Sequence, residues 1–146
     1  MTSFIIIRYL HFIGIFLVVG TLCAEMFMIK ASHTRKELGR LAKIDGIYGL
    51  GALITVTAGL LMWFWVGKPA SFYSQNWVFH LKVTLFVIVG IMSIWPTLFF
   101  IKNRKGNSEE LVEVPRKIRA IIKAEVHLLA IIPLLAVLMA LGKGAF

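Results

Sequence analysis

The sequence has few charged residues and a single cysteine, and no polar segment is long enough to form a soluble domain. Charged residues make up 16% of its 146 positions, against about 25% in soluble proteins, whereas 59% are hydrophobic and 12% aromatic. The mean hydropathy is +0.85. This composition excludes a disordered chain and argues against a soluble globular domain, so we expect a protein of the lipid bilayer. The lone Cys23 excludes an intramolecular disulfide and is typical of a small core residue, so it says nothing about the redox compartment.

Acidic residues are also scarce. Seven Asp and Glu residues stand against 16 Lys and Arg residues, which gives a net charge of +9. In a soluble protein this excess would suggest nucleic-acid binding. Here the connections between hydrophobic runs hold most of the excess, so we expect no nucleic-acid partner.

Four hydrophobic runs cover most of the chain. Each is longer than the roughly 20 residues that cross about 30 Å of hydrocarbon as a helix. The sequence therefore predicts an all-α fold, an integral membrane antiparallel four-helix bundle that forms a single domain over residues 1–146. The predicted helices lie at about residues 4–29, 44–66, 77–101 and 118–141.

The basic residues predict the orientation of this bundle. The first and third connections are rich in Lys and Arg, so the positive-inside rule places both in the cytoplasm and both termini outside. An N-terminal signal peptide is the competing interpretation of the first run, but it lacks a basic n-region, and we expect no cleavage. The third connection, at 107–115, is predicted to be a solvated loop, and His33 in the first connection a solvated side chain.

Ionisable residues inside the predicted spans form two layers. Arg8, His11, His80 and Lys82 lie in the outer half, which is therefore cationic. A charge at the bilayer centre costs about 2.5–3.5 kcal/mol on insertion scales, so each such residue indicates a partner, a water cavity or a ligand.

The inner half carries the acidic residues Glu25, Asp45 and Glu125. We expect Glu25 and Asp45 to pair with nearby cations rather than to carry protons. The candidate cations are Lys30, Arg40, Lys43 and Lys123.

Helical periodicity predicts which side chains face the bundle. At 100° per residue, His11 and Glu25 share one face of the first helix, together with Val18 and Leu22. The second helix is predicted to place a stripe of small residues against a neighbour, and this stripe also suggests a homodimer. Its members are Asp45, Gly49, Ala52 and Gly59.

Three histidines inside the spans suggest a cofactor. Two neutral imidazoles from different helices are the axial ligands of a low-spin b-type haem, which bundles often hold between helices. We expect His11 to be one ligand and His80 or His127 the other. Arg8 and Lys82 would pair with the haem propionates. The leading hypothesis is thus a haem b or porphyrin-binding membrane oxidoreductase that acts in electron transfer or porphyrinogen oxidation.

Two alternatives stay open at this point. In the first, the histidines form hydrogen bonds between helices and the chain is a non-enzymatic transport, metal-handling or complex-stabilising subunit. Under that interpretation the functional residues are Glu25 and Asp45 rather than the histidines. In the second, His80 and the aromatic residues near Trp77 bind a quinone.

Short motifs in all four predicted helices resemble a bacterial inner-membrane family of unknown function. The resemblance covers nearly the whole chain and implies the four-helix fold in a bacterial inner membrane, where the outward termini given by the basic connections are periplasmic. It is carried by YLHFIG at 9–14, RLAKID at 40–45, HLK at 80–82, SIWPT at 93–97, EV at 125–126 and IPLL at 132–135.

The same motifs are distantly similar to the HemJ type of protoporphyrinogen IX oxidase. The first helix of that family carries a Leu-His pair, and its third helix opens with His-x-Lys. The resemblance implies haem b binding and six-electron oxidation of a porphyrinogen. It also implies that His11 and Lys82 are essential for catalysis.

Overall fold

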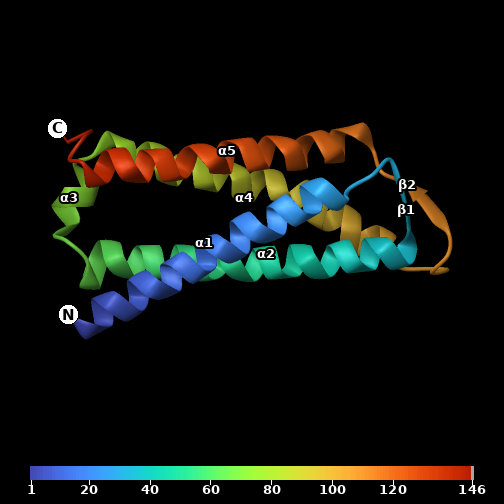
Figure 1. Ribbon diagram of the computed structural model, residues 1–146, viewed down its shortest axis with the longest axis horizontal. Coiled ribbons are helices and arrows are strands. Elements are labelled where there is room, and N and C mark those ends of the chain that lie inside the picture. Colours follow the sequence, from blue (N-terminus) through green and yellow to red (C-terminus); the bar gives the residue numbers. More distant parts are fainter. Residues whose placement is uncertain (146) are drawn as a thin grey trace.

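The chain folds into four long helices that run antiparallel along one axis, as the sequence predicted (Figure 1). The computed structural model describes residues 1–145. All four long helices are apolar enough to span a membrane. Their bounds are α1 Thr2–Met28, α2 Arg35–Leu61, α4 Trp77–Asn103 and α5 Arg116–Ala140.

Shorter elements connect the helices at the two ends of the bundle. We call the end that holds β1 (Ser32–Thr34) and β2 (Leu111–Glu113) the basic end. The opposite end, which we call the terminal end, holds both chain termini and α3 (Ala70–Ser74) (Figure 1). A single π-helical stretch, η1 (Met62–Val66), continues α2 toward α3.

Helix α2 begins at Arg35, nine residues before the predicted start at 44. The reason is a capping box: Thr34 Oγ1 accepts a hydrogen bond from the Glu37 N–H, and the Glu37 carboxylate accepts one from the Thr34 N–H. The first turns of α2 are therefore polar and lie beyond the hydrophobic run.

The connection at 107–115 is largely exposed, as predicted, but it contains the strand β2 rather than being a loop throughout. Strands β1 and β2 pair in antiparallel register, with His33 opposite Val112. The Arg35 Nε–H donates to Glu110 Oε2 over 2.8 Å, and this hydrogen bond lowers the pKa of the Glu110 carboxyl.

The expectation of a solvated His33 is wrong, because the side chain is only 4% exposed. Its Nε2 accepts a hydrogen bond from the Lys30 N–H over 2.9 Å, and its Nδ1–H donates to Glu37 Oε2 over 3.0 Å. His33 thus links the end of α1 to the start of α2.

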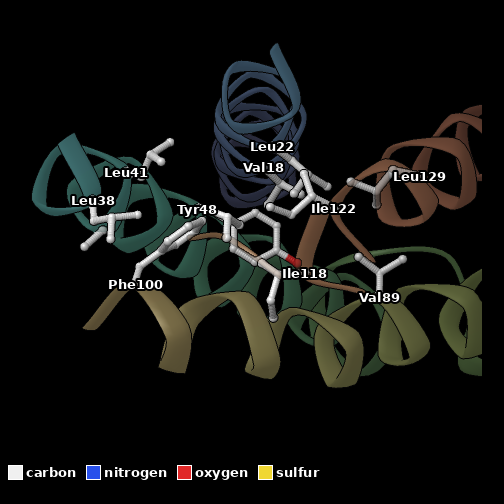
Figure 2. Close-up of a cluster of buried hydrophobic side chains, with 12 residues drawn as sticks. Val18, Leu22, Leu38, Leu41, Tyr48, Val89, Phe100, Ile118, Ile122 and Leu129 are labelled. Atoms are coloured by element: carbon white, nitrogen blue, oxygen red, sulfur yellow. The ribbon is translucent and has the colours of Figure 1, made fainter. Parts of the chain in front are cut away.

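The main hydrophobic core lies in the half of the bundle toward the basic end. Side chains from all four long helices meet there, as Figure 2 shows. A smaller cluster near the terminal end joins α4 to α5, and side chains of η1 and α3 pack against it. The main cluster includes Val18, Leu22, Leu38, Leu41, Tyr48, Val89, Phe100, Ile118, Ile122 and Leu129.

Helices α1 and α2 cross closely at two glycines. A Cβ on Gly51 would lie 2.7 Å from Leu17 Cβ, and one on Gly14 would lie 2.8 Å from the Thr55 backbone nitrogen. The small-residue face of α2 therefore exists, but Gly51 forms the contact, whereas the predicted Gly49 is exposed.

Candidate functional site

Three buried carboxyl groups meet in the core near the basic end. Glu25 comes from α1, Asp45 from α2 and Glu125 from α5. Their side chains are 1%, 6% and 0% exposed, respectively. Asp45 lies close enough to both glutamates for the charges to interact. We call Glu25, Asp45 and Glu125 the carboxyl cluster.

Helical spacing explains how the cluster forms. The buried residues of α1 are Gly14, Val18, Leu22 and Glu25, at intervals of three and four, so one stripe carries the carboxyl group into the core. The shared face predicted for Val18, Leu22 and Glu25 is thus confirmed.

No cation among residues 1–145 neutralises the carboxyl cluster. These residues form one ion pair, Arg35 with Glu110, and a hydrogen bond from His33 to Glu37. The expectation that Glu25 and Asp45 pair with the basic residues is therefore wrong. The expected partners Lys30, Arg40, Lys43 and Lys123 are exposed, because their long stems carry the charge to the surface.

Several carboxyl oxygens of the cluster have no hydrogen-bond partner. Glu25 Oε1 and both side-chain oxygens of Glu125 are buried without a donor among the described residues. An unpaired charge in such a position is costly. A carboxyl group can take up a proton, so the cluster is chemically able to bind and release protons.

Polar side chains that sequence reasoning missed surround the cluster. Tyr48 is buried and close enough to interact with all three carboxyl groups, and its ring lies among the core side chains in Figure 2. Ser93 and Thr97 of α4 approach Tyr48 and Asp45, respectively. The spacing of Ser93 and Thr97, four residues apart, was a signal that could have placed them on one face.

His11 lies half-buried between α1 and α2. Its Nδ1–H donates to the Thr55 carbonyl oxygen over 2.8 Å, and a Cβ on Gly59 would lie 3.3 Å from the ring. Lys82 of α4 is also half-buried, and its charge is within range of the His11 ring, but no hydrogen bond links the two side chains.

The other predicted cofactor residues lie apart from this pair. His80 and His127 are exposed on the outside of the single chain. Their ring N–H groups donate to the carbonyl oxygens of Ser74, over 2.8 Å, and Lys123, over 2.6 Å. The exposed Arg8 lies over the rings of two neighbouring phenylalanines on α1. Of the three histidines within the spans, only His11 is thus directed into the bundle.

Two further features bear on ligands. Residues 1–145 contain no group of three or more His, Cys, Asp or Glu side chains arranged to hold a metal ion. An apolar cavity of about 140 Å³ lies between α1 and α5, where Leu22 and Leu129 form part of its lining. These two leucines are one helical turn from Glu25 and Glu125.

Comparison with known proteins gives one family match. Residues 3–144, nearly the whole chain, match the family described as predicted membrane protein, DUF2214. No curated protein and no solved structure matches the chain. The comparisons show no similarity to the HemJ type of oxidase. On the strength of its helical spans and this match, the chain belongs to the DUF2214 family of predicted membrane proteins.

Proposed function

We propose that this chain is a non-enzymatic membrane protein that takes part in proton-linked transport, with the carboxyl cluster as its proton carrier. The observation that carries the proposal is the burial of Glu25, Asp45 and Glu125 without a cation partner. Intramembrane carboxyl groups of this kind form the proton relays of pumps and transporters. It belongs to the alternative that the sequence left open, in which the histidines form hydrogen bonds between helices and the chain is a non-enzymatic subunit.

The position of the cluster supports a coupling between protons and helix packing. Each carboxyl group comes from a different helix, so a change in protonation alters the repulsion between α1, α2 and α5. The cavity between α1 and α5 lies one turn away, where the two helices can separate with little loss of packing. Protonation draws the helices together, and loss of a proton drives them apart.

The placement of His80 and His127 also favours this class over a cofactor held by two histidines of one chain. Both side chains are exposed, and their ring N–H groups donate to the backbone carbonyls of Ser74 and Lys123. His33 donates to Glu37 at the basic end, outside the predicted spans.

Proton flux into liposomes tests the proposal. Protein is reconstituted with an internal pH-sensitive dye, and a valinomycin-clamped potassium gradient drives proton entry. We expect Glu125→Gln, which removes the exchangeable proton at nearly constant size, to reduce the flux at least about 10-fold. Glu109→Gln, in the exposed connection before β2, is the matched control and should leave the flux unchanged. Wild-type flux equal to that of empty liposomes, or equal flux in Glu125→Gln, would overturn the proposal.

Haem b or porphyrin binding is a second candidate, which one observation favours. The bond from His11 Nδ1–H to the Thr55 carbonyl leaves Nε2 with a free lone pair, and metal-bound histidines are held in this way. Lys82 would pair with a propionate. When bound, haem supplies one-electron transfer. Because His80 and His127 face outward, the residues of one chain fit ligation by a single histidine, and a second ligand requires another copy of the chain.

An absorption spectrum tests this candidate. Protein purified in detergent after haem supplementation is measured before and after addition of dithionite. Haem ligation predicts a Soret band with sharp reduced bands that are lost in His11→Ala and kept in Thr57→Ala, an exposed α2 position. A folded, colourless preparation contradicts haem binding.

A further inference from the structure

The basic end holds a second polar site, which is separate from the carboxyl cluster. A hollow of about 580 Å³ lies where the connection after α1 meets the start of α5. Two arginines, Arg116 and Arg119, line it together with Ala31, Ser32 and the exposed Glu113. Neither arginine forms an ion pair within residues 1–145.

Arg119 has an unused donor in this hollow. Its Nε–H is buried and has no hydrogen-bond acceptor among the described residues. A buried guanidinium donor without a partner is costly, because the group carries a full charge. An acceptor from outside the chain would satisfy this donor, and an anionic oxygen would satisfy it best.

The place of the hollow in the bundle indicates the source of that oxygen. Arg116 and Arg119 lie in the first turn of α5, directly beside the predicted start of the membrane-crossing run at residue 118. This is the depth at which phospholipid headgroups lie, and basic pockets at helix ends are typical binding sites for them. The N-terminus of α5 adds a favourable dipole for a negative group.

We propose that the hollow between the α1 connection and α5 binds the phosphate group of an anionic phospholipid, with Arg116 and Arg119 as its ligands. The neighbouring Lys117 and Lys123 add positive charge, and Glu113 is the single acidic residue that lines the hollow. A forked guanidinium matches the geometry of a phosphate with two parallel hydrogen bonds.

Thermal unfolding in mixed micelles tests the site. The protein is titrated with phosphatidylglycerol, with phosphatidylcholine of the same chain length, or with inorganic phosphate. Of these three additives, we expect only phosphatidylglycerol to raise the midpoint temperature of unfolding. Arg119→Gln should weaken its apparent affinity about 10-fold, the effect of losing one charged hydrogen bond. Arg116→Gln, at an exposed position that leaves the core intact, should weaken it in the same direction.

Lys43→Gln is the matched control, because it removes one exposed charge from the same end of the bundle but lies outside the hollow. Equal weakening by Lys43→Gln would show a diffuse attraction and overturn the site. Equal stabilisation by inorganic phosphate would show a free-anion site and overturn the assignment to a lipid. Equal stabilisation by phosphatidylcholine would show that the net negative charge of the lipid is not recognised, and would overturn the assignment to an anionic phospholipid.

Discussion

Gly51→Val is expected to force α1 away from α2 and to lower the free energy of unfolding by about 1–3 kcal/mol or more, as overpacking does in tight interfaces. Even a single Cβ at this position would lie 2.7 Å from Leu17 Cβ and 3.0 Å from the Val18 backbone nitrogen. The backbone of α1 cannot yield as a flexible side chain does. Because Val18 belongs to the stripe that also holds Leu22 and Glu25, the displacement would reach the carboxyl cluster.

Chemical unfolding in detergent, followed by circular dichroism, measures this effect. Gly46→Val is the matched control, because a Cβ at Gly46 meets no atom within 4 Å. Both variants carry the same change in helix propensity on the same helix. The difference between their free energies of unfolding therefore measures the effect of the close contact between α1 and α2. Equal losses in the two variants would contradict the close contact.

Glu125→Leu is expected to abolish proton flux and to raise the free energy of unfolding by about 1–3 kcal/mol, the cost of a buried polar group without a partner. Both carboxyl oxygens of Glu125 lack a donor, and its neighbours in the core include Ile122 and Leu129. A leucine would fill similar space and would bury no polar oxygen without a partner. A substitution that raises the stability of the protein and removes its activity indicates that the original residue serves function rather than folding.

The same unfolding assay, combined with the liposome assay, checks this pair of effects. Glu109→Leu, in an exposed connection, should change stability by no more than about 0.5 kcal/mol and leave the flux intact. A clear loss of stability in Glu125→Leu would instead identify this carboxyl group as a structural partner of its neighbours.

The cluster itself was partly predictable from the sequence. The three acidic residues lie within the predicted spans or at their edges, and helical periodicity correctly placed Glu25 on the face of Val18 and Leu22. The sequence pattern did not show that these carboxyl groups would face one another rather than a lysine. That outcome depends on where long basic side chains extend, and Lys30, Lys43 and Lys123 extend to the surface.

The histidines show the limit of the same reasoning. Spacing along α1 indicated that His11 points inward, and the structure confirms that it is half-buried. For His80 and His127, the sequence predicted the depth in the membrane. It did not predict how α4 and α5 are rotated about their own axes. Burial of Val78 and Phe79, and of Glu125 and Leu129, turns His80 and His127 outward.

The sequence by itself determined the four spans and the membrane environment, because an apolar run of more than 20 residues has few other stable states. The local sequence also holds the signal for the start of α2, the Thr34 and Glu37 capping box, although hydrophobicity alone placed that start nine residues later. Only the tertiary structure decided that Gly51 rather than Gly49 meets α1, that His33 is buried, and that three carboxyl groups share one site. These features depend on the rotation and crossing of packed helices, which long-range contacts fix and local pattern does not.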